Sequence, residues 1–339
     1  MLLNYAEIFN EKKLFLKFNG LQLIFINKLN DSDRNEEILN KQKLFSHYYN
    51  EFLHHSYSAY CIIEQMNQLE IAIMKQYIEL KPNIEFKNET QVGYESFVVN
   101  EYLNRIMPFL NTLFILQDRI MLIIAMYLDI TFEKPKKKEN ETERKYKRRI
   151  KKFKDDLQSF ASYSGNKHGI LKEFPNDIQN LVKKYWNKNG QKIRNYRNLE
   201  QHQFNLLEEA YLQLKTYERF ILRLPDNPNE RDFEKLTYKK NIITSDYFKT
   251  EFHIFHRFVE NLMYIMNIRT ETHKNGASFS PKSNSLENFN EGDLMKIWVI
   301  KKEALLFRVG EKSKDGKCAG IKMRKINNKL DKIILEIKD

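Results

Sequence analysis

The longest helical pattern in the sequence covers residues 36–80 and reads EEILNKQKLFSHYYNEFLHHSYSAYCIIEQMNQLEIAIMKQYIEL. Its apolar side chains recur at roughly the spacing of an α-helix. They are Leu44, Tyr48, Phe52, Ile62, Met66, Leu69 and Ile73. Lys81 and Pro82 follow, and the residue before a proline is disfavoured in a helix. We therefore expect a long amphipathic helix over 36–80, with at most one interruption.

The composition favours helices elsewhere too, because 10 glycines and 7 prolines are few for a turn-rich fold of 339 residues. A second helical pattern covers about 94–132, and Pro108 should kink it or split it in two. Further helical patterns cover about 144–154, 178–186, 192–224 and 245–270. The predicted fold class is mainly α, a helical bundle whose helices are joined by loops of moderate length.

Small β elements are expected at both ends of the chain. Asn19-Gly20 stands between apolar β-forming residues, which predicts a β-hairpin within 14–26. Residues 271–292 are rich in Asn, Ser and Gly, and β-forming residues recur at 297–300, 305–309 and 333–337. The predicted organisation is an N-terminal hairpin extension at 1–35, a helical domain at 36–270, a linker or loop at 271–295 and a small β-rich appendage at 296–339.

The chain is basic, with 57 Lys and Arg against 45 Asp and Glu and a net charge of +12. This excess suits an anionic partner such as nucleic acid. The run from Glu133 to Lys154 contains 12 Lys and Arg against 4 Glu. It predicts an RNA-binding arm, although a solvated loop could have the same composition. The proposed RNA contacts in this run are Lys136, Lys137, Lys138, Arg148 and Arg149.

Two observations bear on location. Cys61 and Cys318 lie far apart and show no metal-binding spacing, which favours a reducing cytoplasm. The most apolar stretch, 109–130, has three consecutive polar residues at its middle, 117–119, which favours a buried helix over a membrane span. We therefore expect a cytoplasmic protein that has no membrane partner, no metal site and no cofactor.

One short motif carries chemistry. The segment Arg197-Asn198-Leu199-Glu200-Gln201-His202 reads as an arginine, a polar residue, three others and a histidine. It resembles the signature of the HEPN family (higher eukaryotes and prokaryotes nucleotide-binding domains), many of which are metal-independent ribonucleases. The resemblance covers roughly 36–270 and implies a helical bundle with the motif on its third helix. It also implies a homodimer whose motif helices face each other. Because such proteins occur in toxin–antitoxin and antiviral defence systems, an antitoxin or regulatory protein is an implied partner.

The motif suits RNA cleavage because RNA carries its own nucleophile, the 2′-hydroxyl. An imidazole can transfer the proton, and a guanidinium can stabilise the charge on the phosphate. The resemblance assigns catalysis to Arg197 and His202, and Asn198 matches its polar position. On a straight helix Arg197 lies about 140° from His202, whereas Arg194, Asn198 and His202 form a stripe. Arg194 is thus a second candidate phosphate ligand, and Lys192 and Tyr196 are further candidate RNA contacts.

The predicted function is therefore that of a metal-independent endoribonuclease. Three alternatives remain open at this point. The chain could be an RNA- or nucleotide-binding helical module that does not cut, or a scaffold that binds another protein and uses its charge for solubility. The motif could also be a chance pattern on a surface helix. A test of phosphate binding would separate the scaffold from the endoribonuclease and the binding module. Analysis of the RNA products would separate the endoribonuclease from the binding module.

Overall fold

The computed structural model describes residues 12–30, 36–80, 96–203, 209–213, 218–268, 323–326 and 329–333. The chain divides into two compact units, one made of Leu3–Glu271 and the other of Met1–Leu2 with Thr272–Asp339, and each is described by itself. Three sequence predictions lie outside the described residues: the linker at 271–295 and the strands at 297–300 and 305–309.

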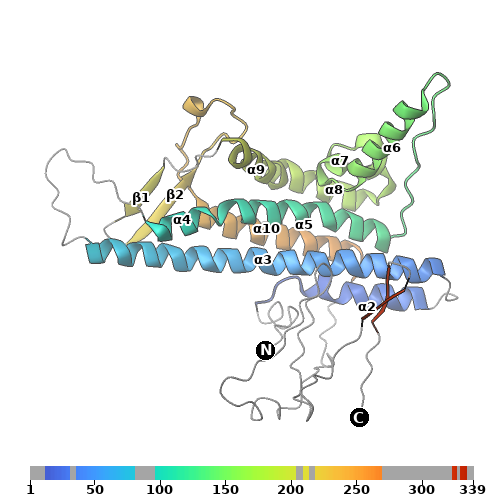
Figure 1. Ribbon diagram of the computed structural model, residues 1–339, viewed down its shortest axis with the longest axis horizontal. Coiled ribbons are helices and arrows are strands. Elements are labelled where there is room, and N and C mark those ends of the chain that lie inside the picture. The colour runs from blue at the N-terminus through green and yellow to red at the C-terminus, as the bar shows by residue number, and fades with distance from the viewer. Residues whose placement is uncertain are drawn as a thin grey trace, which may run out of the picture. The chain divides into compact units, whose positions relative to one another are not determined.

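The larger unit is mainly helical and is organised around α3 (Glu36–Leu80), which confirms the predicted long helix. Figure 1 shows α5 (Ile106–Tyr127) and α10 (Thr244–Ile265) running alongside it. The helix predicted over 94–132 is split into α4 (Phe97–Leu103) and α5. Pro108 falls in the first turn of α5, where its missing N–H leaves no helical bond unmade. The expected effect of Pro108 is thus confirmed.

The core of this unit is rich in aromatic side chains. Phe109 of α5 and Phe248 of α10 are both fully buried and stack with their ring centroids 4.2 Å apart. Tyr185 and Phe258 stack in the same way at 4.3 Å. Burying one such side chain contributes about 1.5–3 kcal/mol, and a ring pair adds about 0.5–1.5 kcal/mol. These contacts join helices that are far apart in the sequence.

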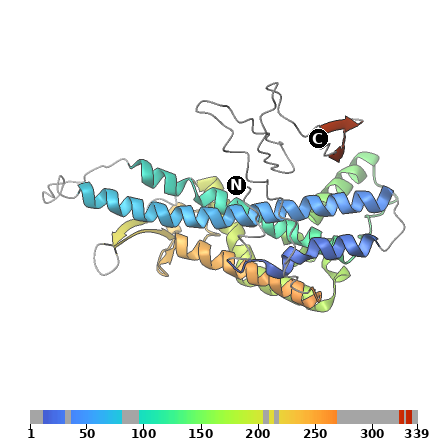
Figure 2. The same cartoon turned by 90° about the horizontal axis from the view of Figure 1, so that it is seen from below.

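The N-terminal hairpin prediction is wrong, because residues 16–30 form a helix, α2 (Leu16–Asn30). The buried side chains of this helix recur at helical spacing and face the core, at Phe18, Leu21 and Phe25, and Phe15 just before the helix is buried as well. The backbone N–H groups at its start also have acceptors on α10. Glu260 accepts from Lys17 and Phe18, at 3.1 and 3.4 Å to Oε1. Figure 2 shows α2 and α10 on the same side of α3.

The middle of the chain forms a run of shorter helices. They are α6 (Glu143–Leu157), α7 (Phe160–Ser164), the 3₁₀-helix η2 (Lys167–Glu173), α8 (Asn176–Tyr185), the π-helical turn η3 (Trp186–Gly190) and α9 (Gln191–Gln203). The helices predicted at 144–154 and 178–186 are confirmed as α6 and α8. In Figure 1, α6 rises away from α3 at one end of the unit.

The helix predicted over 192–224 is correct only in its first part, since α9 ends at Gln203. Two antiparallel strands follow, β1 (Ala210–Gln213) and β2 (Arg219–Leu224), and β2 also pairs with β3 (Ile242–Ile243). Buried residues alternate along β2, at Phe220, Leu222 and Leu224. This period of two is that of a strand with one buried face. The short 3₁₀-helix η4 (Phe233–Lys235) lies between β2 and β3.

The described part of the second unit is a two-stranded antiparallel hairpin. It consists of β4 (Met323–Ile326) and β5 (Lys329–Ile333). Both strands fall within the region where the sequence predicts a small β-rich appendage.

Candidate functional site

A buried polar network on α5 fixes the start of α9, which carries the motif. Gln117 is fully buried, and its side-chain amide donates to the hydroxyl of Tyr185 at 3.0 Å and to the carbonyl of Gly190 at 3.5 Å. Its carbonyl oxygen accepts from Nε of Arg194 at 3.2 Å. A Cβ added at Gly190 would lie 3.0 Å from the Tyr185 ring and 3.2 Å from the Trp186 ring, so a larger residue in this π-helical turn would require these rings to shift. Gln117 therefore connects α8, η3 and α9 through one side chain.

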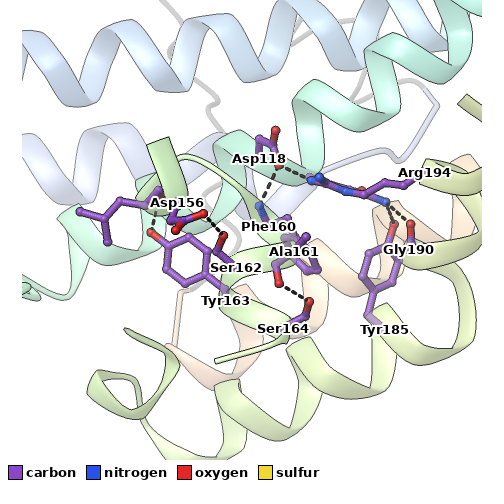
Figure 3. A network of polar contacts seen from close by, with 12 residues as sticks. Asp118, Asp156, Phe160, Ala161, Ser162, Tyr163, Ser164, Tyr185, Gly190 and Arg194 are labelled. Carbon is purple, nitrogen blue, oxygen red and sulfur yellow. Dashed lines mark hydrogen bonds and ion pairs between the residues drawn. The ribbon is translucent and has the colours of Figure 1, made fainter. Parts of the chain in front are cut away.

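Asp118 is the charged member of this network. Its carboxylate accepts a hydrogen bond from the backbone N–H of Phe160 at 2.8 Å and forms an ion pair with Arg194 (Figure 3). Burial raises the pKa of Asp118, and the Arg194 charge and the N–H of Phe160 oppose that rise. Asp118 thus anchors both α7 and α9 to α5. Arg119, the next residue, pairs instead with Glu51 at 2.7 Å.

Arg194 is not available as the predicted phosphate ligand. Only 9% of it is exposed, and its guanidinium is paired with Asp118 and lies over the Phe114 ring, 4.1 Å from the centroid. Burial lowers its pKa, and the Asp118 charge opposes that change. The expected stripe of Arg194, Asn198 and His202 is therefore not one exposed surface, because Arg194 is buried whereas Asn198 is exposed.

Arg197 has a different environment, although it lies one turn further along α9. It is half-buried, its Nε donates to Oδ1 of Asn111 at 3.0 Å, and its guanidinium lies 4.5 Å from the centroid of Phe114. Within the described residues it forms no ion pair with a carboxylate. The guanidinium is thus held in place by a neutral amide and an aromatic ring, and its positive charge is not neutralised by a partner there.

His202 lies in α9, but its side chain is outside the described residues. The geometry between Arg197 and His202 therefore remains a prediction.

The two remaining candidates on α9 are packing residues. Tyr196 is fully buried, and its hydroxyl donates to the carbonyl of Pro225 at 2.6 Å. It cannot stack on an RNA base without leaving the core. Lys192 is half-buried, and its Nζ lies 5.4 Å from the centroid of the Tyr196 ring and 5.1 Å from that of Tyr247. Burial lowers its pKa. Neither Tyr196 nor Lys192 is positioned to make the predicted contact with RNA.

The basic run does form a cationic surface, most of it on α6. Thr142 caps this helix by accepting from the N–H of Lys145 at 3.4 Å, and Phe153 and Asp156 face inward. The exposed cations of α6 are Arg144, Lys145, Lys147, Arg148, Lys151, Lys152 and Lys154. Within the described residues none of these seven has an ion-pair partner.

The predicted contacts of the basic run divide into two groups. Lys136, Lys138 and Arg148 are exposed and have no ion-pair partner in the part of the chain that the structure describes. Lys137 pairs with Glu143 at 3.0 Å. Arg149 donates to Glu141 at 2.5 and 3.0 Å and to the carbonyl of Lys136 at 2.7 Å. Arg149 therefore holds the loop against α6 and is not free for RNA.

Sequence reasoning missed one polar cluster, at the end of α6. Asp156 of α6 contacts His168 of η2, and these residues are twelve apart in an irregular region with no recognisable motif. The one sequence signal is indirect. Asn166, His168 and Gly169 are residue types that tolerate a left-handed backbone, and all three adopt a positive φ.

The comparisons with known proteins give no relatives. No family model matches the chain, no curated protein matches it, and no solved structure matches its fold.

The described residues contain no group of three or more His, Cys, Asp or Glu that could hold a metal ion. One helical stretch, Phe97–Tyr127, is long and apolar enough to cross a membrane by length and composition, and 61% of its most apolar window is buried inside the protein. A core helix of a soluble protein passes the same test.

Proposed function

We propose that the protein binds RNA through the exposed cations of α6 and cleaves it at Arg197 and His202 of α9. The reaction is that of a metal-independent endoribonuclease, as the likeness of residues 197–202 to the HEPN signature implies. The observation that carries this proposal is the contrast between the two arginines of α9. Arg194 is neutralised by Asp118, whereas Arg197 has no carboxylate partner within the described residues.

A guanidinium of this kind suits a phosphate. It stays charged at any physiological pH and can donate to two phosphate oxygens at once. The side chain of Asn111 and the ring of Phe114 already hold Arg197, so little ordering is required when the phosphate arrives. The charge to be stabilised is greatest in the transition state, when the phosphate becomes a phosphorane.

The proposed reaction needs only the RNA and these side chains. The imidazole of His202 takes the proton of the 2′-hydroxyl, the 2′-oxygen attacks the adjacent phosphorus, and a P–O2′ bond forms. The P–O5′ bond then breaks, and the 5′-oxygen receives the proton from the imidazolium of His202. Arg197 donates to the non-bridging oxygens during both steps. The products are a 2′,3′-cyclic phosphate and a 5′-hydroxyl.

The second candidate function is RNA binding without cleavage. The specific observation in its favour is the surface of α6, whose seven exposed cations do not depend on the side chains of α9. Neutralising phosphates with such side chains supplies most of the affinity of sequence-independent binding.

A comparison of three full-length variants tests the proposed function. Arg197→Ala and His202→Ala should each lower the rate of RNA cleavage by about 10² to 10⁴-fold, with little change in the Kd for RNA. Arg257→Ala is the matched control, because Arg257 is exposed on α10 and has no ion-pair partner among the described residues. Cleavage that is unchanged in both motif variants contradicts the assignment. RNA binding without cleavage by the wild-type protein favours the second candidate function.

A further inference from the structure

The polar cluster at the end of α6 is built around one buried carboxylate. Asp156 is 8% exposed and accepts three side-chain hydrogen bonds. Ser162 Oγ and Lys167 Nζ donate to Oδ1, each at 3.1 Å, and Nε2 of His168 lies 2.9 Å from Oδ2. Figure 3 shows the side chain of Ser162 meeting Asp156. Burial alone would raise the pKa of Asp156, but the bonds from His168, Lys167 and Ser162 outweigh it and lower that pKa.

This carboxylate orients the imidazole of His168. Because the ionised Asp156 only accepts, Nε2 of His168 carries the proton of their shared hydrogen bond. In neutral imidazole the other nitrogen, Nδ1, is then an acceptor with a free lone pair. Nδ1 makes no hydrogen bond within the described residues. About a third of the side chain, 33%, is exposed, and its ring meets the edge of Phe153 at 5.3 Å.

The backbone at His168 is unusual. Asn166, His168 and Gly169 all have left-handed conformations, with φ of 48°, 53° and 73°. Residues other than glycine rarely adopt this region, and such residues persist only where the surroundings hold them. At His168 the contacts with Asp156 and Phe153 do so. The same backbone turns the imidazole toward the end of α6.

Several exposed cations lie in the last turns of α6, close to Asp156 along the helix. Lys152 is four residues before Asp156, so the two lie on the same side of α6 one turn apart. Lys151, Lys152 and Lys154 are all exposed and have no ion-pair partner within the described residues, whereas Lys167 is paired with Asp156 at 3.1 Å. An RNA backbone bound by the last turns of α6 would therefore pass close to the imidazole.

We propose that His168 and Asp156 form a second proton-transfer site, which acts on RNA held by Lys152 and the other exposed cations in the last turns of α6. Nδ1 of His168 takes the proton of a 2′-hydroxyl, and the 2′-oxygen forms a bond to the adjacent phosphorus. The P–O5′ bond breaks, and the leaving 5′-oxygen takes the proton back from the imidazolium. Asp156 positions the ring and stabilises its positive charge, as a carboxylate does beside a catalytic histidine. This inference rests on the proposed RNA binding by α6 and is independent of the side chains of α9.

The test uses full-length protein in which the α9 site has been removed by His202→Ala. In this background His168→Gly deletes the imidazole, and the positive φ of residue 168 is comfortable for glycine. The matched control is His253→Ala, at an exposed histidine of α10. Cleavage of a labelled single-stranded RNA is measured with and without added imidazole, and imidazole without protein is subtracted. RNA binding is measured separately by fluorescence anisotropy.

We expect the cleavage that remains in the His202→Ala protein to be lost on adding His168→Gly and to be partly restored by imidazole. The Kd for RNA and the His253→Ala control should not change. A purely structural role for His168 would show no restoration by imidazole, and that result overturns the inference. Loss of all cleavage in His202→Ala alone also overturns it and leaves the α9 site in place. Full cleavage in His202→Ala that disappears with His168→Gly supports it and contradicts the α9 assignment.

Discussion

Arg194 and Arg197 lie three residues apart on α9 and contact the same ring, that of Phe114. Their partners give them different roles. Arg194 pairs with Asp118 in a setting where both are largely buried, so it belongs to the framework that fixes α9 on α5. Arg197 is held by the neutral side chain of Asn111. The sequence spacing alone places Arg194, and not Arg197, on the same helix face as His202, but the ion pair with the buried Asp118 removes Arg194 as a phosphate ligand.

This difference predicts unequal effects of two alanine substitutions. Arg194→Ala leaves Asp118 buried without its counter-charge, and breaking such a pair costs about 3–5 kcal/mol of unfolding free energy. Arg197→Ala removes one hydrogen bond of a half-buried side chain and should cost about 0.5–1.5 kcal/mol. Urea unfolding followed by circular dichroism measures both.

A matched control separates the effect of the missing charge from that of the missing packing. The double variant Arg194→Ala/Asp118→Ala should recover part of the stability that Arg194→Ala removes, since no unpaired carboxylate remains. Equal destabilisation by Arg194→Ala and Arg197→Ala would contradict the framework role of Arg194.

His256 predicts a dependence of stability on pH. Burial, with the charges of His253 and Arg257, lowers the pKa of His256 to about 4 from its ordinary value of 6.5. Its Nδ1 accepts from the N–H of Phe15 at 3.1 Å, which requires the unprotonated nitrogen. Between these two pKa values the unfolded chain binds the proton more strongly than the folded one. Stability from this residue is therefore fully present above about pH 6.5 and is lost as the pH falls toward 4.

Comparison with His256→Asn measures this contribution. The asparagine Oδ1 can still accept from Phe15 but does not titrate, so the unfolding free energy of the variant should fall less steeply over this pH range. Glu260 has a raised pKa caused by burial and affects both proteins alike. His47→Asn on α3 controls for the loss of a histidine. Identical pH profiles for wild type and His256→Asn would show that His256 does not titrate in this way.

At the scale of elements, α2 shows where local sequence signals fail. Asn19-Gly20 has strong hairpin propensity, yet it lies inside a helix. The start of that helix is stabilised by His256 and Glu260, about 240 residues away in the chain. No local pattern can reveal a capping group at that distance. The same holds for β2, whose strand conformation depends on pairing with β1 and β3.

The cationic surface of α6 gives an element-scale prediction. Changing Lys147, Arg148, Lys151 and Lys152 to glutamine should weaken RNA binding and flatten its dependence on salt. For each phosphate that these side chains no longer neutralise, the slope of log Kd against log salt should fall by about 0.7 for single-stranded RNA. Arg149 is left unchanged, because its bonds to Glu141 hold the preceding loop.

The matched control changes the net charge equally at other exposed lysines of the same unit. These are Lys183, Lys184, Lys239 and Lys240, on α8 and in the turn before β3. Their replacement by glutamine should leave the slope nearly unchanged. If both quadruple variants flatten the slope to the same degree, the attraction is a property of the overall charge and not of α6.

For the molecule as a whole, the sequence was informative where a pattern is long and self-contained. The 45 residues of α3, the split near Pro108 and the helices α6 and α8 follow from periodicity and local breakers. The candidate site was less predictable. Residue types and their spacing indicated Arg197 as a candidate. Only the fold shows that Tyr196 is buried and that Arg149 forms an ion pair with Glu141. The pair of Asp156 and His168 depends on a left-handed turn, which no spacing rule finds.

The last prediction concerns the chemistry of the whole protein. If side chains alone suffice, as proposed for Arg197 and His202 of α9 and for His168 and Asp156 at the end of α6, cleavage should continue in EDTA. It should leave a 2′,3′-cyclic phosphate and a 5′-hydroxyl, because the nucleophile is the 2′-oxygen of the RNA itself. A substrate with a 2′-deoxynucleotide on the 5′ side of the scissile bond should bind with the same Kd and resist cleavage.

Mass spectrometry of the fragments, with and without EDTA, measures this outcome. The deoxy-substituted RNA is the internal control, since it removes the nucleophile and keeps the phosphates that the cations of α6 contact. Activity that EDTA abolishes and Mg²⁺ restores would contradict a metal-independent reaction, and products with a 5′-phosphate would require an activated water as nucleophile. That water attacks phosphorus from outside the RNA, so the deoxy-substituted substrate would then be cut as well. The response of this one substrate therefore distinguishes attack by the 2′-oxygen from hydrolysis.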